Sequence, residues 1–253
     1  MRVLSALAFS FVLSACSSAP AATVTATPAR TPTPTLFITT SAPTPSPTAT
    51  TPPFRYVAIG ASDTVGVGSA DPRTGSWPAR IAARLPAGTD YVNLGVSGSL
   101  ASQASADQVP TAAGLRPQLV TVWLAVNDLN ANVSPSDYGA ALRRVVGPLV
   151  TLTDARVFVG NVPDLRSVPA YAGTDQTGLL ARINAYNAVI AALAASFPSS
   201  PSRVTVVDLF TGSGPLVSTI TVSADGFHPS DAGYALIADR FARAIADAGI
   251  ALR

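Results

Sequence analysis

The sequence contains no lysine and no glutamate, so every basic side chain is an arginine and every acidic one an aspartate. Only 12% of its 253 residues are charged, whereas 48% are hydrophobic, and the formal net charge is +2. No cluster of basic residues indicates a nucleic-acid partner, and we expect none. The single cysteine excludes a disulfide within the chain. Because there is also only one histidine, a zinc site built from several Cys or His ligands is excluded as well.

The N-terminus has the features of an export signal. A short apolar stretch follows Arg2 and leads into Leu13-Ser-Ala-Cys16. The stretch is too short to span a bilayer, which takes about 20 apolar residues, and small residues before a cleavage site are typical of secretory signals. Residues 13–16 resemble the lipobox of bacterial lipoproteins, in which the cysteine is acylated. The alternative is an ordinary cleaved signal with an incidental cysteine.

The lipobox resemblance implies a signal peptide over residues 1–15 and a lipid on Cys16. The protein would then be exported and anchored at the outer face of the bacterial cell membrane or at the cell surface. Residues 16–53 consist largely of Thr, Pro, Ala and Ser. This composition cannot bury a core and favours extended chain. We therefore expect a disordered linker that spaces the next domain from the membrane, although a tail without a spacing role would have the same composition.

The pattern in residues 54–253 predicts a single α/β domain, which we expect to be a monomer. Apolar, β-branched runs that are typical of strands covered on both faces occupy residues 55–59, 91–94, 119–124, 156–159 and 203–207. Stretches that favour helices lie at 77–85, 136–152, 176–197 and 230–250. Strands that alternate with helices indicate a three-layer α/β/α sandwich with about five parallel strands. In such folds, ligands bind beyond the carboxyl ends of the strands.

Residues with chemical potential follow several of these predicted strands. Ser62 comes just after the first strand, Gly98 lies in a glycine-rich segment after the second, and Asn127 follows the third. The segment Asp225-Gly-Phe-His228, before the last helix, holds the only histidine. A serine hydroxyl becomes a strong nucleophile when a base removes its proton and an acid orients that base. Taken singly, each residue has an ordinary alternative as a turn, cap or surface residue.

Together these segments resemble the SGNH, or GDSL-type, family of esterases and lipases, which has a flavodoxin-like fold. The family takes a Ser, a Gly, an Asn and a His from four separate blocks, and the resemblance covers the whole predicted domain. It implies a catalytic triad in which Ser62 is the nucleophile, His228 the base and Asp225 the acid that orients the base. It assigns the oxyanion hole to the N–H groups of Ser62 and Gly98 and the amide of Asn127. It implies neither a metal nor an organic cofactor.

Two positions depart from the family's pattern. The family's Gly-Asp-Ser is Gly60-Ala-Ser62 in this chain, with Asp63 after the serine instead of before it. The family's Gly-x-Asn-Asp begins here with Ala125. Neither change removes a group that transfers protons, so we expect both departures to affect the rate and the fit of the substrate more than the class of reaction.

The resemblance implies hydrolysis of a carboxylic ester, such as a lipid acyl ester or a sugar acetyl ester, through an acyl-enzyme on Ser62. Residues 162–178 are expected to arch beside the site and shape the acyl pocket. The rival hypotheses are a non-catalytic surface lipoprotein that binds glycan or lipid with the same fold, and a structural envelope lipoprotein. Because no other imidazole, amine or thiol lies in the domain, we expect a single ionisation, that of His228, between about pH 5 and 9.

Overall fold

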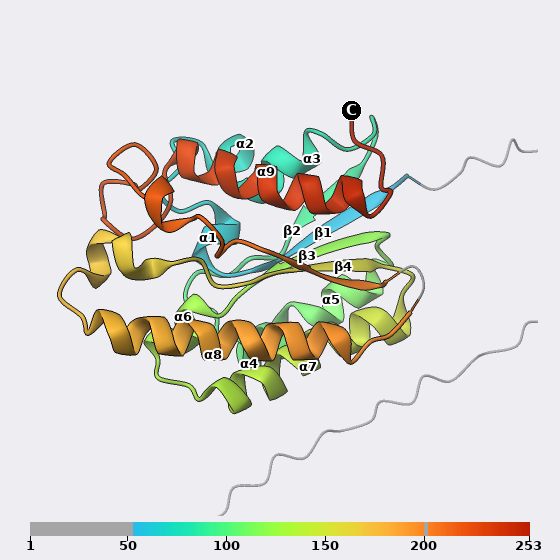
Figure 1. The fold of residues 1–253 in the computed structure, drawn as a ribbon. Coiled ribbons are helices and arrows are strands. Elements are labelled where there is room, and N and C mark those ends of the chain that lie inside the picture. The colour runs from blue at the N-terminus through green and yellow to red at the C-terminus, as the bar shows by residue number, and fades with distance from the viewer. Residues whose placement is uncertain (1–52, 200–201) are drawn as a thin grey trace, which may run out of the picture. The chain divides into compact units, whose positions relative to one another are not determined.

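The computed structural model describes residues 53–199 and 202–253 (Figure 1). The predicted signal peptide, Cys16 and the linker up to residue 52 lie outside these residues, so those predictions stay predictions. One parallel sheet has the strand order β2-β1-β3-β4-β5. Its strands are β1 (Arg55–Gly60), β2 (Asp90–Asn93), β3 (Leu119–Trp123), β4 (Arg156–Gly160) and β5 (Val204–Val207).

Helices cover both faces of the sheet (Figure 1), which confirms the predicted three-layer α/β/α sandwich. On one face lie α2 (Pro72–Gly75), α3 (Trp77–Ala82) and α9 (Asp231–Asp247). On the other lie α4 (Ala101–Asp107), α5 (Val109–Gly114), α7 (Pro135–Leu152) and α8 (Gln176–Ala195). Two short helices, α1 (Ser62–Val65) and α6 (Val126–Asn130), directly follow β1 and β3. Single 3-10 turns are η1 (Leu165–Ser167), η2 (Pro169–Tyr171) and η3 (Gly214–Leu216).

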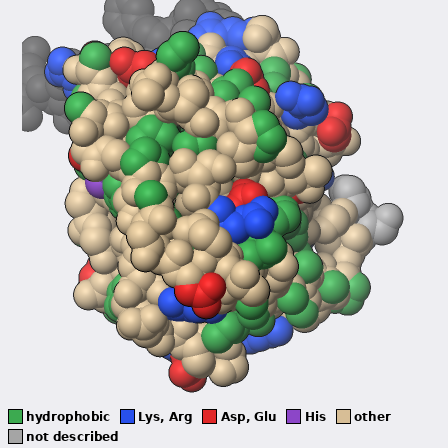
Figure 2. Space-filling view, turned by 60° about the vertical axis from the view of Figure 1, so that its left-hand side comes forward, with side chains coloured by type: hydrophobic (Ala, Val, Ile, Leu, Met, Phe, Trp, Pro, Cys, Tyr) green, Lys and Arg blue, Asp and Glu red, His purple; other side chains and the backbone are tan. Residues whose placement is uncertain are grey.

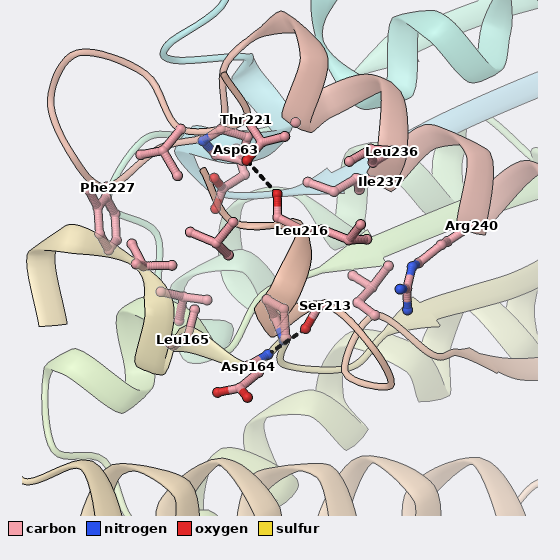
Figure 3. A pocket seen from close by; sticks show the side chains of 18 of the residues that line it. Asp63, Asp164, Leu165, Ser213, Leu216, Thr221, Phe227, Leu236, Ile237 and Arg240 are labelled. Carbon is pink, nitrogen blue, oxygen red and sulfur yellow. Dashed lines mark hydrogen bonds between the residues drawn. The ribbon is translucent and has the colours of Figure 1, made fainter. Parts of the chain in front are cut away.

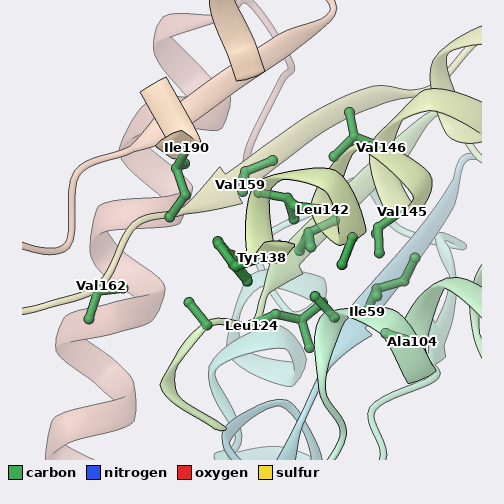
Figure 4. Close-up of a cluster of buried hydrophobic side chains, with 14 of the residues drawn as sticks. Ile59, Ala104, Leu124, Tyr138, Leu142, Val145, Val146, Val159, Val162 and Ile190 are labelled. Atoms are coloured by element: carbon green, nitrogen blue, oxygen red, sulfur yellow. The ribbon is translucent and has the colours of Figure 1, made fainter. Parts of the chain in front are cut away.

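The strands are apolar throughout because successive residues enter two different cores. In β1, Val57 and Ile59 face the core formed with α4, α7 and α8 (Figure 4). Tyr56 and Ala58 of the same strand face the core formed with α3 and α9. Side chains of a strand point alternately to the two faces of its sheet, so a sheet covered on both faces selects apolar residues at every position. Strand β1 lies between β2 and β3 and is therefore fixed by neighbouring strands and by both cores, up to the end that leads into Ser62.

The surface reflects the small number of charged residues. Figure 2 shows Arg and Asp side chains in small groups between uncharged polar and hydrophobic ones. Several of these charges pair, as Arg84 does with Asp239 at 2.6 Å. Because exposed pairs of this kind contribute only about 0–1 kcal/mol each, we attribute the stability of the domain mainly to its two apolar cores.

The predicted helices that end later than the observed ones stop for local reasons. The helix expected over 77–85 ends at Ala82 and tightens into turns that reach Leu85, which precedes Pro86 and is therefore disfavoured in helical conformation. The helix expected over 230–250 ends at Asp247, and Gly249 then adopts a φ of 84°, in the left-handed region that terminates many helices. The ends of these helices are therefore set by single residues.

The sequence pattern missed α4 and α5. These helices lack the stripe of large apolar residues by which a helix is recognised. The buried residues of α4 are the alanines Ala101 and Ala104. Side chains this small leave little hydrophobic signal but permit close packing against α7. Helix α4 lies next to the carboxyl edge of the sheet, and its last turn reaches the predicted site. The small alanines therefore matter for function, because they let the helix pack in this position.

Helix α8 is the one described helix long and apolar enough to cross a membrane by length and composition. Its residues Ile183, Tyr186 and Ile190 are buried in the core, and Tyr186 stacks on Tyr138 of α7 with ring centroids 4.7 Å apart. Core helices of globular domains meet the same criterion, so we assign α8 to the helical layer.

Ala125 has a backbone conformation that alanine rarely adopts, with φ of 93° and ψ of −42° immediately before α6. Strain of this kind costs about 1–3 kcal/mol, and glycine avoids it. Glycine also gives the unfolded chain more conformational freedom, and this effect offsets about 0.4–1 kcal/mol of the stability gained by removing the strain. We therefore predict that Ala125→Gly raises the free energy of unfolding by about 1 kcal/mol, as measured by urea denaturation.

The matched control for this prediction is Ala131→Gly at the other end of α6, where φ is −77°. Since alanine is unstrained there, the control should lose about 0.5–1 kcal/mol. A loss at Ala125 as large as that at Ala131 would show that the positive φ stores no strain.

Candidate active site

Ser62 is the first residue of α1, directly beyond the carboxyl end of β1. The residue is only 7% exposed. The first N–H groups of a helix have no partner within that helix, and no acceptor for the Ser62 N–H lies in the described part of the chain. Ser62, which the sequence predicts to be the nucleophile, is therefore nearly buried and has a backbone N–H without a described partner.

Gln108, at the C-cap of α4, fixes the chain just before the serine. Its Oε1 accepts the N–H of Gly60 at 3.0 Å, and its Nε2 donates to the carbonyl of Gly60 at 2.9 Å. The same Nε2 donates to the Ser99 hydroxyl at 3.3 Å. This buried amide thus connects the segment of the nucleophile with the segment that follows β2. Sequence reasoning missed Gln108, although its helical spacing from the buried alanines of α4 places it on the same face.

Asp225 and His228 form a compact unit in the loop before α9. Oδ2 of Asp225 lies 2.5 Å from Nδ1 of His228. Its Oδ1 accepts the backbone N–H groups of Phe227 and His228 at 2.8 Å and 2.9 Å, and the hydroxyl of Ser223 at 2.7 Å. Burial disfavours the charged carboxylate, but these hydrogen bonds outweigh it and hold the pKa of Asp225 well below its ordinary value. Ionised Asp225 accepts only, so Nδ1 carries the proton.

The other nitrogen of the imidazole reaches the serine. Nε2 of His228 lies 2.9 Å from Oγ of Ser62. Because Nδ1 carries the proton of the neutral ring, Nε2 is free to accept the serine proton. Phe227 packs against the ring nearly at right angles, with centroids 4.8 Å apart. The structure therefore brings the three residues predicted as a triad into one continuous chain of hydrogen bonds.

Two contacts hold the serine segment against α9. The hydroxyl of Tyr234, a fully buried side chain, donates to the carbonyl of Val67 at 2.5 Å. The hydroxyl of Ser69 donates to Asp231 at 2.5 Å. Both partners on α9 lie in its first turn, next to the loop that carries the histidine. These contacts therefore set the distance between the nucleophile and the base.

Gly68 allows this close approach. Its φ is 94°, and a Cβ atom built on it would lie 2.5 Å from the carbonyl oxygen of Pro229 and 3.0 Å from the side chain of Ser223. A side chain at this position would therefore be strained in its backbone and would collide with both neighbours. The contact joins the segment after Ser62 to the residue that follows His228.

The predicted oxyanion-hole residues lie at the ends of the strands on either side of β1. Gly98 lies in the turn after β2, and no described residue accepts its N–H. Asn127 lies in α6 after β3, and its Nδ2 donates to the carbonyl of Ser99 at 3.1 Å. An amide nitrogen carries two hydrogens, so one donor of Asn127 stays available. Each of the three predicted donor groups thus has an N–H without a protein partner in the described chain.

Asp128, which follows Asn127 in α6, connects α6 to α4 by hydrogen bonds. Only 1% of the residue is exposed, and its carboxylate oxygens accept the N–H of Ala101 at 3.0 Å and 3.3 Å. Burial raises the pKa of Asp128, against the effect of these hydrogen bonds. Gln108, at the C-terminal end of α4, bonds to the chain before Ser62. Ala101, at the N-terminal end of α4, donates its N–H to Asp128 of α6. The same helix therefore supports both the nucleophile segment and the α6 segment.

An apolar cavity of about 120 Å³ (Figure 3) has in its wall Asp63, which follows Ser62, and Phe227 and Pro229, which flank His228. Its walls come from residues after β3, β4 and β5 and from α9. Residues 162–178, which were expected to shape the acyl pocket, supply part of this wall. The apolar lining residues are Trp123, Val126, Pro163, Leu165, Val168, Tyr171, Leu209, Leu216, Val217, Val222, Phe227, Pro229, Leu236 and Ile237.

Asp63 is a charged residue in the wall of this cavity, directly after Ser62. Burial raises its pKa from 3.8 to about 6, and the nearby Asp225 adds to the rise, while His228 opposes it. The expectation that His228 alone titrates between about pH 5 and 9 is therefore wrong. The sequence could not show this second group, because the ordinary pKa of an aspartate lies far lower and only burial moves it.

The sequence matches the model of the GDSL-like Lipase/Acylhydrolase family over residues 58–236. The protein therefore belongs to this family of acylhydrolases. Comparison with curated protein sequences finds no match.

Solved structures with a similar fold include TesA, with 22% identity and a TM-score of 0.59 over 77% of this chain and 99% of that one. A mutant of Axe2, an acetyl-xylooligosaccharide esterase from Geobacillus stearothermophilus, has 21% identity and a TM-score of 0.60 over 76% and 94%. The family 3 carbohydrate esterase of Clostridium thermocellum has 20% identity and a TM-score of 0.58 over 78% and 96%. At these identities the likeness shows the shared fold.

The raised pKa of Asp63 predicts that this residue makes stability depend on pH. Between about pH 4 and 6, the native state keeps a proton on Asp63 that the unfolded chain has released. The free energy of unfolding should therefore fall as the pH rises through this window. Asp63→Asn removes the ionisation, so its stability relative to the wild type should be higher at pH 8 than at pH 4, by about 1–3 kcal/mol.

Urea denaturation at a series of pH values measures this difference. The control is Asp154→Asn, which neutralises an exposed carboxylate just before the amino-terminal end of β4. Its stability should run parallel to that of the wild type across the same pH range. A parallel curve for Asp63→Asn as well would show that Asp63 titrates alike in the native and unfolded states.

Proposed function

We propose that this protein is a serine esterase that hydrolyses a carboxylic ester through an acyl-enzyme on Ser62. The observation that carries this proposal is the chain of hydrogen bonds from Asp225 through His228 to Ser62, with lengths of 2.5 Å and 2.9 Å. Membership of an acylhydrolase family supports it. The three residues would act as nucleophile, base and orienting acid, as in other serine hydrolases.

In the proposed mechanism, Nε2 of His228 takes the proton of Ser62 as the serine oxygen attacks the ester carbonyl carbon. Ionised Asp225 stabilises the imidazolium that forms. The N–H groups of Ser62 and Gly98 and the free amide hydrogen of Asn127 would stabilise the negative oxygen, and losing one such donor typically costs about 3 kcal/mol or more. The imidazolium then protonates the departing alcohol. Water, activated by the same imidazole, releases the acid from Ser62.

The proposed substrates are lipid acyl esters or sugar acetyl esters. The small apolar cavity beside Asp63 supports an acyl group of limited length, since its volume is about 120 Å³. Among the proteins of similar fold, one is named for acetylated xylooligosaccharides and another is a carbohydrate esterase. A domain that only binds glycan or lipid is the less favoured alternative, because binding alone does not require a serine, an imidazole and a carboxylate in line.

We predict that Ser62→Ala and His228→Ala each lower kcat/KM for p-nitrophenyl acetate by about a thousandfold or more. Neither change should unfold the domain, because both side chains lie at the edge of the sheet and outside the two cores. Asp225→Asn should lose less than His228→Ala, since the base remains. The control is Ser102→Ala, at an exposed position on α4, which should keep wild-type activity.

A fluorophosphonate probe gives an independent measure, because it labels a serine only when a base activates it. The probe should label the wild type and the Ser102→Ala variant but not the Ser62→Ala variant. A wild type that neither hydrolyses the ester nor takes the label would leave the binding protein as the better hypothesis, whereas unchanged hydrolysis and labelling after Ser62→Ala would place the nucleophile elsewhere.

We further propose that Cys16 carries a lipid anchor at the outer face of the cell membrane, on the basis of the lipobox resemblance of residues 13–16. Stable anchoring takes at least two lipid chains or another membrane signal. We predict that an alkyne-tagged fatty acid supplied to expressing bacteria labels the wild-type protein and the control variant Ser17→Ala. The Cys16→Ser variant should remain unlabelled. Equal labelling of all three would place the lipid elsewhere or show a contaminant.

A further inference from the structure

Asp63 is a half-buried carboxylate in a mainly apolar wall, and the one described donor to it is its own backbone N–H. Figure 3 shows its side chain directed into the cavity among hydrophobic side chains. No other residue in the described part of the chain donates a hydrogen bond to its carboxylate oxygens. A half-buried carboxylate keeps part of its hydration, and a ligand that covers it without supplying a donor removes that hydration at a cost in free energy.

The other buried or half-buried carboxylates near the site behave differently. Asp225 accepts hydrogen bonds from four donors on its own loop. Asp128 accepts the N–H of Ala101, and Asp164 pairs with Arg166 at 2.7 Å. Among these carboxylates, Asp63 is thus the one that accepts no hydrogen bond from another described residue, and its side chain points toward the space that a ligand would fill.

The position of Asp63 connects this cavity to the proposed reaction. Asp63 is the next residue after Ser62, and the cavity is also lined by Phe227 and Pro229, which flank His228. Ser62 and His228 do not line the cavity themselves, but their chain neighbours do, and we therefore place the acyl group of the ester in this cavity. A small, mainly apolar cavity suits a short acyl chain better than a hydrated sugar or another polar alcohol.

We propose that Asp63 determines the specificity of this site: the cavity takes a short acyl group that carries a hydrogen-bond donor, a hydroxyl or an ammonium, which binds to the Asp63 carboxylate. The inference rests on the proposed esterase function and names its substrate class. A plain hydrocarbon chain would cover the carboxylate without supplying a donor, which the site should disfavour. A donor-bearing chain satisfies both the apolar wall and the charged group.

The test compares matched p-nitrophenyl esters at pH 8, where a group with a pKa of about 6 is ionised. One pair is butyrate and β-hydroxybutyrate, and the other is caproate and ε-aminocaproate. The quantity measured is the ratio of kcat/KM within each pair. A substitution that affects the nucleophile or the base changes kcat/KM by the same factor for both esters of a pair. This factor cancels in the ratio, so the ratio reports on binding in the cavity.

The wild type should prefer the donor-bearing ester of each pair. Asp63→Leu should remove this preference, with a change in each ratio of about tenfold to a hundredfold. Asp63→Asn keeps the shape and a hydrogen-bond acceptor but not the charge. It should therefore lose the preference for the ammonium while retaining part of that for the hydroxyl. Asp154→Asn, the remote control, should leave both ratios unchanged.

Equal ratios in the wild type and both Asp63 variants would overturn the inference. So would an equal change in kcat/KM for all esters, because Asp63 would then act through His228 alone. Hydrolysis of p-nitrophenyl acetate, whose acyl group carries no donor, separates this failure from that of the esterase proposal. If the wild type cleaves the acetate and Ser62→Ala does not, the esterase stands whatever the ratios. Asp63→Asn, the smaller change, covers the case in which Asp63→Leu does not fold.

Discussion

The contact between residues 67–69 and the first turn of α9 holds the proposed active site together. The nucleophile and the acid–base pair are far apart in sequence, and each is built separately. Gln108 fixes the chain before Ser62, whereas Asp225 and His228 are fixed within their own loop. One hydrogen bond between reacting groups joins the halves. The hydrogen bond from the buried Tyr234 hydroxyl to the Val67 carbonyl keeps Ser62 and His228 at the distance that their own hydrogen bond requires.

Much of the fold followed from the sequence because the strands of a doubly covered sheet are apolar at every position. The predicted residues Ser62, Asp225 and His228 could be selected because each lies beside a predicted strand or helix end, and the structure brings them together. The supporting groups could not be selected in this way. Gln108 bonds to a glycine far along the chain, and the helix that carries it has only alanines on its buried face. The raised pKa of Asp63 depends on burial, which no local pattern records.

The two departures from the family's pattern line one small pocket and have different physical consequences. Ala125 places a methyl group where the backbone has a positive φ, next to the segment that carries the proposed oxyanion donor Asn127. Asp63 places a carboxylate where the cavity is otherwise mostly apolar. Helix α4 supports the site through Gln108, which bonds to Gly60, and through Ala101, whose N–H donates to Asp128. The framework that supports the proposed catalytic groups is thus separate from the positions that would adapt the site to its substrate.

The close approach at Gly68 bears on how relatives of this protein should be judged. A larger residue there would push Pro229 away and carry the neighbouring histidine with it. Such a chain would still contain a serine, an aspartate and a histidine in the right order, and a search for those residues would report a complete set. Its serine would nevertheless lack a base within reach. Activity in a relative should therefore be inferred from the catalytic residues together with the small residue that lets their two segments meet.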